Sequence, residues 1–286
     1  MKLLQFRSGD QTHLGLKLPE GVLDLSTAGY TRDLVETIRD YDSVKEELLG
    51  LAARVGAPLL QESSLDYLPA APAHAAVLCV GLNYKLHIEE ASRDLDPGYP
   101  EYPVLFSKFS NALNSHEGIF HTLPSASNYD YEAELAIIMG KSGMNIPVEK
   151  AGDYIFGYSC GNDITAREAQ RLSSQWLIGK SLPGSAPVGP WIVTKEEINP
   201  SRLAISCYRD GVCVQSSNTD QMIFDVYAIV SFASRYLRLE AGDVILTGTP
   251  NGVIMGMEAQ EQNWLKAGDT VTVTIENIGS LVTRFA

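Results

Sequence analysis

Two glutamates stand two residues apart at the start of an apolar run, Glu132 and Glu134 in NYDYEAELAIIMG, residues 128–140. Side chains alternate between the faces of a strand, so these carboxylates would point the same way and repel each other. Either that face is open to water, or a cation neutralises the pair. A third carboxylate, Asp163, ends another apolar run and is either a helix N-cap or part of the same site. Three carboxylates would form an oxygen-only site that suits Mg²⁺ or Mn²⁺, with Ca²⁺ also acceptable, and that suits zinc poorly.

A histidine and a glutamate three residues apart follow the apolar segment VLCVGLNY. On one helical turn, His87 and Glu90 would share a face, where the carboxylate raises the basicity of the imidazole and fixes its tautomer. The same spacing also occurs on solvated helices. Because catalytic groups collect in segments that follow strand ends, the position favours a catalytic pair.

Two further segments offer groups for an anionic ligand. WLIGKSLPG resembles a phosphate-binding loop, but Ser174 stands where the first glycine of that motif would be, so we predict no nucleotide site. Lys180 is then either a cation that meets an anionic substrate or a surface lysine. In ILTGTPNGV a strand ends in an ordinary turn, or in a loop whose N–H groups and Thr249 hydroxyl cradle a carboxylate.

The elements that must position these side chains are mostly strands. Apolar runs bounded by Gly, Pro and Asn recur along the chain, and the clearest helical patterns are at residues 220–239 and just after Asp163. Strands outnumber helices without alternating with them, which predicts an α+β fold dominated by sheet. We expect a small N-terminal α/β domain at residues 1–70 and a main domain at residues 75–286, joined through the Pro- and Ala-rich LPAAPAHAA.

The composition limits the classes of function. The 286 residues are 45% hydrophobic and 20% charged, which allows a large core. A net charge of −13 and the lack of a basic run argue against nucleic acid or an anionic membrane as a partner. We expect a cytoplasmic protein, since the sequence has no signal-peptide pattern and its four cysteines lack C-x-x-C spacing.

Six motifs, in this order, resemble those of the fumarylacetoacetate hydrolase family over about residues 75–286. They are VGLNYKLHIEE, PVLFSKF, YDYEAELAIIMGKSG, FGYSCGNDITAREAQ, IGKSLPGSAPVGPWIVT and LEAGDVILTGTPNGV. The resemblance implies an α+β fold with a sheet-rich roll, a homodimer, and Mg²⁺ or Mn²⁺ held by three carboxylates. The small N-terminal domain also looks like that of many members.

The resemblance also implies roles for the positions that match these motifs. Glu132, Glu134 and Asp163 match metal ligands, and His87 with Glu90 match a catalytic pair. The other matches are Lys180, which would face the bound oxo acid, Thr249, which would contact its carboxylate, Arg167 and Gln170, which would line the same pocket, and Lys108, to which we assign no role. Leu82 departs from the pattern, because many relatives carry a cation there, and this difference concerns specificity.

The leading hypothesis for function is metal-dependent hydrolysis of a C–C bond in a small 2,4-dioxo acid of the acylpyruvate type, releasing pyruvate or a related 2-oxo acid. His87, oriented by Glu90, would take a proton from the attacking water, and Lys180 would stabilise the developing negative charge. The alternatives are oxaloacetate decarboxylation and isomerisation or hydration of an unsaturated 2-oxo acid. A metal-binding protein that acts only through partners is a third class, which the intact set of site residues disfavours. Residues 91–103 are either a lid over the substrate or a surface loop.

Overall fold

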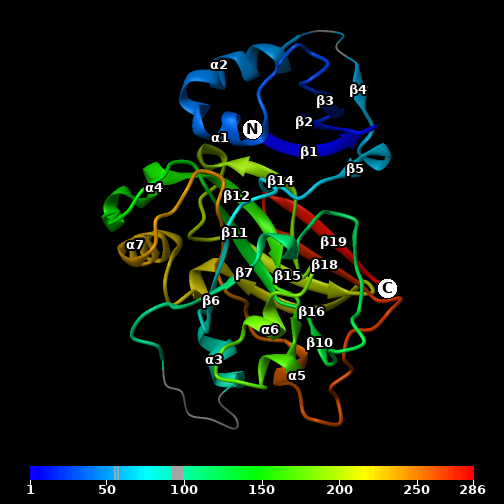
Figure 1. Ribbon diagram of the computed structural model, residues 1–286, viewed down its shortest axis with the longest axis vertical. Helices are drawn as coiled ribbons and strands as arrows, with labels where there is room; N and C mark the ends of the chain where they lie inside the picture. The colour runs from blue at the N-terminus through cyan, green and yellow to red at the C-terminus, as the bar shows by residue number, and fades with distance from the viewer. Residues whose placement is uncertain (55, 57, 92–98) are drawn as a thin grey trace.

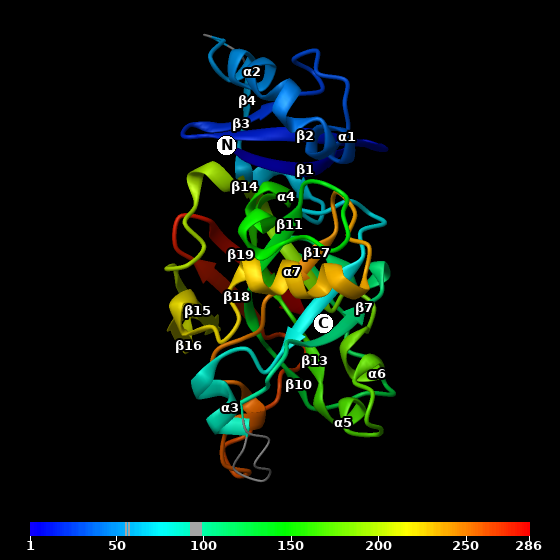
Figure 2. The same cartoon turned by 90° about the vertical axis from the view of Figure 1, so that its left-hand side faces the viewer.

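The computed structural model describes the 286-residue chain except for residues 55, 57 and 92–98. The molecule is elongated, with the N-terminal helices at one end and the helix that carries His87 near the other (Figures 1 and 2). The predicted lid, residues 91–103, lies largely outside the described residues.

One long sheet runs through most of the molecule. Its strands lie in the order β4 (Leu59–Leu60), β3 (Gly21–Asp24), β2 (Gln11–Leu18), β1 (Lys2–Ser8), β14 (Ala186–Thr194), β12 (Ile155–Asn162), β11 (Ala133–Met139), β17 (Val244–Leu246), β6 (Val77–Gly81) and β7 (Val104–Lys108), with β5 (Asp66–Tyr67) paired to β1 and β8 (Leu113–Asn114) paired to β14. N-terminal strand β1 joins the rest of this sheet through the antiparallel pairing of Leu3 with Ile192. Backbone hydrogen bonds therefore connect the two predicted domains, and the division at residues 70–75 stays a prediction.

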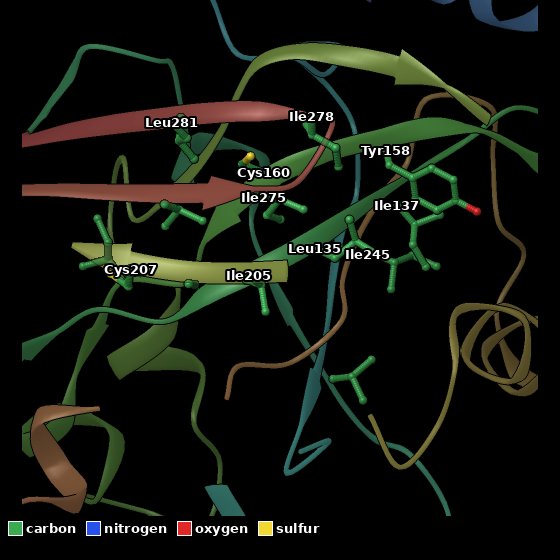
Figure 3. Close-up of a cluster of buried hydrophobic side chains, with 14 of the residues drawn as sticks. Leu135, Ile137, Tyr158, Cys160, Ile205, Cys207, Ile245, Ile275, Ile278 and Leu281 are labelled. Atoms are coloured by element: carbon green, nitrogen blue, oxygen red, sulfur yellow. The ribbon is translucent and has the colours of Figure 1, made fainter. Parts of the chain in front are cut away.

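A second sheet packs against the first. Its strands lie in the order β16 (Val212–Asn218), β15 (Ala204–Arg209), β18 (Thr270–Ile275), β19 (Gly279–Phe285) and β9 (Gly118–Phe120), and β10 (Tyr129–Asp130) pairs separately with β13 (Thr165–Ala166). Figure 3 shows side chains from the two sheets meeting in one apolar cluster, among them Leu135, Cys160, Ile205 and Ile275. The predicted sheet-rich α+β class is confirmed.

Strand β11 is buried along its whole length, because both faces of the sheet are covered there. Leu135 and Ile137 belong to the cluster between the sheets, whereas Ala136 and Ile138 belong to a second cluster shared with the N-terminal segment. Alternation along a strand explains this division. Glu134 lies on the same face as Ala136, at the end of the strand where this second core stops.

Helices are few and mostly short within the described residues. They are α1 (Leu34–Arg39), α2 (Tyr41–Ala52), α3 (Lys85–Ala91), α4 (Ala151–Tyr154), α5 (Arg167–Gln170), α6 (Leu177–Lys180) and α7 (Val226–Tyr236), with single 3₁₀ turns η1 (Glu62–Ser64), η2 (Ser110–Ala112), η3 (Val148–Lys150), η4 (Lys195–Glu197), η5 (Thr219–Gln221) and η6 (Ile254–Gly256). In the part of the chain that the structure covers, no helix is both long and apolar enough to cross a membrane. The predicted cytoplasmic location stays a prediction.

Two predicted helices begin later than their sequence patterns indicate. The pattern over residues 220–239 becomes helical only at Val226, because the Asp225 side chain accepts from Tyr227 N and Ala228 N and so caps the helix there. The helix expected just after Asp163 is one turn that starts at Arg167, since Thr165 and Ala166 pair with β10 instead. Asp163 is therefore not a helix N-cap, which removes the structural alternative for this carboxylate.

Candidate active site

The ends of two neighbouring strands bring the three predicted metal ligands together. Glu132 directly precedes β11 and Asp163 directly follows β12, and the antiparallel register places Ala133 opposite Asn162. A backbone hydrogen bond of 3.0 Å from Asp163 N to Glu132 O fixes this junction. One carboxylate oxygen from each of Glu132, Glu134 and Asp163 lies within 4.8 Å of the other two, and all three residues are buried.

Two cationic side chains contact this group from the short helices α5 and α6. Lys180 Nζ lies 2.6 Å from Glu132 Oε2 and 2.7 Å from Asp163 Oδ2. Arg167 Nη2 lies 2.6 Å from the other oxygen of Glu132, and Arg167 Nη1 donates to Gln170 Oε1 at 3.2 Å. Lys180 is therefore a buried cation inside the carboxylate cluster and not a surface lysine.

Lys108, for which the sequence suggested no role, lies on the far side of Asp163. Its Nζ is 2.6 Å from Asp163 Oδ1 and donates to the carbonyl oxygens of Ile164 at 2.9 Å and Ser185 at 2.6 Å. Both side chains of this ion pair are fully buried. Asp163 thus has a lysine on each of its oxygens, and Lys108 fixes the strand end that carries it.

Asp130 is one of the residues of this site that the sequence analysis missed. One of its carboxylate oxygens accepts from Ile254 N at 2.9 Å, and the other accepts from Met255 N at 3.0 Å and Arg167 Nε at 2.9 Å. It therefore orients Arg167 and anchors the loop after β17. Its spacing of two from Glu132 in YDYEAE is a signal that could have identified it.

The buried charges do not cancel. With every group ionised, four carboxylates, Asp130, Glu132, Glu134 and Asp163, would face three cationic side chains, Lys108, Arg167 and Lys180, which leaves one negative charge. Burial raises the pKa of Glu134 well above its ordinary value, and the charges of Asp163 and Glu132 raise it further. Burial acts the same way on Glu132, but Lys180 and Arg167 outweigh it and hold the pKa of that carboxyl well below its usual range. The repulsion that the sequence predicts is therefore concentrated on Glu134.

A divalent cation fits this set of residues. The donors are oxygens, they converge within 4.8 Å, and Glu134, whose Oε2 accepts a 2.7 Å hydrogen bond from Gly248 N, has no cation paired to it among the described residues. Oxygen ligands with net negative charge suit Mg²⁺, Mn²⁺ or Ca²⁺. A bound dication would relieve the repulsion that raises the pKa of Glu134.

The predicted His–Glu pair forms on α3. His87 is buried, and its Nδ1 lies 3.5 Å from Glu90 Oε2, at the long limit of a hydrogen bond. Both oxygens of Glu90 also accept from Gly252 N at 3.1 Å. Glu90 is therefore positioned between the imidazole and the loop after β17, and within the described part of the chain no group hydrogen-bonds to the other ring nitrogen of His87.

Thr249 lies on that same loop, between Gly248, which binds Glu134, and Gly252, which binds Glu90. Its Oγ1 accepts from Gln215 Nε2 at 3.0 Å. Gln215 was not predicted, because it comes from β16 of the second sheet and no local pattern marks it.

One small cavity has most of these side chains in its wall. Its free volume is about 80 Å³, room for a few water-sized groups and for a small ligand only. The polar side chains in its wall are His87, Glu132, Glu134, Arg167, Gln170, Lys180 and Thr249, and the apolar side is formed by Val80, Leu82, Phe106, Trp176 and Met255. Of the predicted residues, Glu90, Asp163 and Lys108 are not in this wall. Glu90 contacts His87 and Asp163 contacts Lys180, both of which are in the wall, and Lys108 contacts Asp163 behind it.

The fold and the site together indicate an enzyme, because a sheet-rich α+β fold carries a buried acidic cluster, a His–Glu pair and a small cavity with polar and apolar walls. Comparison with known proteins gives its family. Residues 76–286 match the model of the fumarylacetoacetate (FAA) hydrolase C-terminal domain. The chain belongs to the fumarylacetoacetate hydrolase family, as its motifs predicted.

Individual relatives cover nearly the whole chain. Oxaloacetate tautomerase Fahd2a, mitochondrial, from Rattus norvegicus is 35% identical over 293 residues, which cover 99% of this chain and 91% of the relative. The structure of a fumarylacetoacetate hydrolase from the psychrophilic Exiguobacterium antarcticum is 34% identical with a TM-score of 0.83, covering 100% of this chain and 99% of that one. A maleylpyruvate hydrolase from Sphingobium sp. SYK-6, in complex with manganese(II) and pyruvate, shares the fold at 22% identity and a TM-score of 0.80, covering 100% of this chain and 99% of that one.

Proposed function

We propose that this enzyme is a divalent-metal-dependent tautomerase that interconverts the enol and keto forms of a small 2-oxo acid, with oxaloacetate as the first candidate. The observation that carries the proposal is the placement of His87, held by Glu90, in the wall of the same small cavity as Glu132, Glu134 and Lys180. A side chain that could transfer a proton therefore lies in the wall of the cavity that two of the proposed metal ligands, Glu132 and Glu134, also line. The name of the rat relative, oxaloacetate tautomerase, supports this choice of substrate.

Glu132, Glu134 and Asp163 would hold the metal, with Mg²⁺ or Mn²⁺ as the expected ion. When bound, a divalent cation supplies Lewis acidity to the oxygens of the 2-oxo carboxylate. Its charge also offsets the excess negative charge of the buried cluster.

His87 would move the proton. In the keto-to-enol direction, the ring nitrogen that does not face Glu90 would take a proton from C3 of the substrate, and water would supply the proton that the 2-oxygen takes up. In the reverse direction the 2-oxygen would lose its proton to water, and the imidazolium would return a proton to C3. Glu90 accepts from the other nitrogen and so fixes the tautomer that can act as a base. The hydrogen bonds from Gly252 keep this carboxylate in place during the transfer.

Lys180, Thr249 and Gln170 would bind the substrate anion. Lys180 stays charged, because Asp163 and Glu132 raise its pKa against the opposing effect of burial. Its charge would offset the negative charge that develops on the 2-oxygen as the proton leaves C3. Thr249 and Gln170 would donate to carboxylate oxygens from the cavity wall. Each of the three nitrogens of Arg167 donates one hydrogen bond, to Asp130, Gln170 and Glu132, so we assign it the positioning of Glu132.

The second candidate is hydrolysis of an acylpyruvate, the leading hypothesis from the sequence. The same His87–Glu90 pair could activate a water in place of C3, and the similar structure from Exiguobacterium antarcticum is a fumarylacetoacetate hydrolase. Tautomerisation needs less space than hydrolysis, because the small cavity then holds the substrate without an attacking water. Decarboxylation and isomerisation of related oxo acids pass through the same enol and remain alternatives. A metal-binding protein that acts only through partners would leave the His–Glu pair without a function.

The test is a substrate panel with the full chain and Mg²⁺ or Mn²⁺. Enol-oxaloacetate, which absorbs in the ultraviolet, should convert to the ketone faster than without enzyme and without release of pyruvate. Acetylpyruvate and fumarylpyruvate serve as the hydrolase arm, and pyruvate from oxaloacetate reports decarboxylation. Pyruvate release from an acylpyruvate, with no acceleration of the enol conversion, would replace this proposal by the second candidate. The homodimer also stays a prediction.

A further inference from the structure

We infer that Gln215 is a positioning residue that turns the Thr249 hydroxyl into a hydrogen-bond donor aimed at the cavity. The inference rests on the proposed function, because the group that would receive this donor is a carboxylate oxygen of the substrate. Gln215 lies on the second sheet, is 2% exposed, and connects the strand of the acidic residues with the loop of Thr249.

The orientation of the Gln215 amide follows from two partners that can act in only one way. Ala133 N donates to Gln215 Oε1 at 3.0 Å, and a backbone N–H cannot accept. On the other side, Gln215 Nε2 donates to Pro250 O at 2.8 Å, and a carbonyl cannot donate. The amide oxygen must therefore face Ala133 and the amide nitrogen must face Pro250.

This orientation decides the direction of the bond to Thr249. Gln215 Nε2 lies 3.0 Å from Thr249 Oγ1 and carries a second hydrogen, so the amide donates and the hydroxyl accepts. The hydroxyl hydrogen must then point elsewhere. Thr249 is 3% exposed and forms part of the cavity wall, and in the described parts of the chain no residue accepts this hydrogen. A buried donor without a partner is costly, so the site favours a ligand that brings an acceptor.

The hydrogen bonds of Gln215 connect Thr249 with the segment that carries two of the proposed metal ligands. Ala133, whose N–H holds the Gln215 oxygen, stands between Glu132 and Glu134. Gln215 therefore sets the distance between the strand that carries these carboxylates and the hydroxyl that would bind the substrate. An acid that contacts both must match that distance.

The experiment is a double-mutant cycle read by ligand binding to the full-length, Mn²⁺-loaded protein. Oxalate, an unreactive mimic of a planar 2-oxo acid, is the probe, and calorimetry measures its dissociation constant. Gln215→Met and Thr249→Val should each weaken oxalate binding by about 10-fold, the size expected for one hydrogen bond to a charged group. The double variant should bind no more than about 2-fold more weakly than Thr249→Val alone, because Gln215 acts through that hydroxyl.

Two measurements separate this role from a general effect on structure. Mn²⁺ affinity of the metal-free protein should change by less than about 3-fold in Gln215→Met, since the three carboxylates are untouched. Gln5→Met is the matched control, because Gln5 Nε2 also donates two hydrogen bonds, to the carbonyl oxygens of Pro69 and Ala71, each at 3.0 Å. That variant should bind Mn²⁺ and oxalate as the wild type does. If Gln215→Met does not fold, Gln215→Asn replaces it in the same cycle.

Additive losses in the double variant, or a loss of Mn²⁺ affinity equal to the loss for oxalate, would overturn the inference. Failure of the proposed function gives a different result, in which wild-type protein binds oxalate and follows the cycle but does not accelerate the enol conversion. A wild-type protein that binds Mn²⁺ but no oxalate would contradict both.

Discussion

Lys180 Nζ lies 2.6 Å from Glu132 Oε2, in an ion pair whose side chains are at most 6% exposed. The same ammonium is 2.7 Å from Asp163 Oδ2, so it bridges two of the three carboxylates that we propose as metal ligands. A bound cation must share these carboxylates with Lys180. The affinity of the site for metal and the charge of this lysine are therefore linked.

Replacing Lys180 by Met should make this link visible. The variant removes a competing positive charge, so Mn²⁺ should bind about 10-fold more tightly, a factor that corresponds to one moderate charge interaction. Activity should fall at the same time, because no cation then offsets the charge on the substrate. Titration with Mn²⁺ followed by electron paramagnetic resonance measures the affinity. Weaker Mn²⁺ binding in Lys180→Met would show that the lysine supports the metal site instead of competing with the metal.

Glu134 should make metal binding depend on pH. Burial, with the charges of Asp163 and Glu132, raises the pKa of Glu134 above its ordinary value of 4.5. In the metal-free protein this group therefore contributes stability below pH 4.5 that is lost as the pH rises through the folded-state pKa. Mn²⁺ competes with the same proton, so its affinity should increase with pH, and binding should release up to about one proton.

Calorimetry in two buffers of different ionisation enthalpy counts the released protons. Glu134→Gln is the companion variant, since it has no proton to lose. It should bind Mn²⁺ about 100-fold or more weakly, while the metal-free form keeps its stability as the pH rises. Equal Mn²⁺ affinity across the pH range, with no proton release in the wild type, would contradict the assignment of Glu134 as a ligand.

Lys108 should matter for stability. Its Nζ compensates the fully buried Asp163 at Oδ1, so Lys108→Met leaves that oxygen without its cation, with only Lys180 still paired to the carboxylate, and should lower the free energy of unfolding by about 3–5 kcal/mol. Lys141→Met is the matched control, because the Lys141–Asp42 pair at 3.1 Å is exposed. Lys141→Met should lower the free energy of unfolding by about 1 kcal/mol or less. Urea unfolding of the metal-free proteins compares the two, and equal losses would show that Lys108 does not hold Asp163.

Gly256 offers a test of Glu90 without changing Glu90 itself. A Cβ at this position would overlap the end of the Glu90 side chain, which is flexible enough to move away. Gly256→Ala should therefore fold and bind Mn²⁺ normally but lose about 10-fold or more in kcat, because His87 loses its partner. Gly50→Ala in α2, where a Cβ meets no atom within 4 Å, should keep full activity and gain up to about 1 kcal/mol of stability. Full activity in Gly256→Ala would mean that Glu90 does not orient His87.

The sequence predicted those parts of the site that local patterns encode. The period of two in Glu132 and Glu134 and the period of three in His87 and Glu90 each follow from the geometry of one element, and the motif order predicted the family and the α+β fold. The contacts between elements were beyond such patterns. Lys108 meets Asp163 only because β7 and β12 lie in one sheet, and Gln215 reaches Thr249 from a second sheet. Asp130 could have been predicted from the sequence, since it stands two residues before Glu132 and so continues the spacing of the two glutamates.

The central claim, that His87 transfers a proton on a metal-dependent oxo acid, is tested most directly by the rate of enol-oxaloacetate conversion in wild type and His87→Gln. Both proteins are loaded with Mn²⁺, and binding of the ion is measured separately. We predict that His87→Gln binds Mn²⁺ as the wild type does and converts the enol about 10²- to 10⁴-fold more slowly, the usual contribution of a general base. An equal rate in the two Mn²⁺-loaded proteins would contradict the claim.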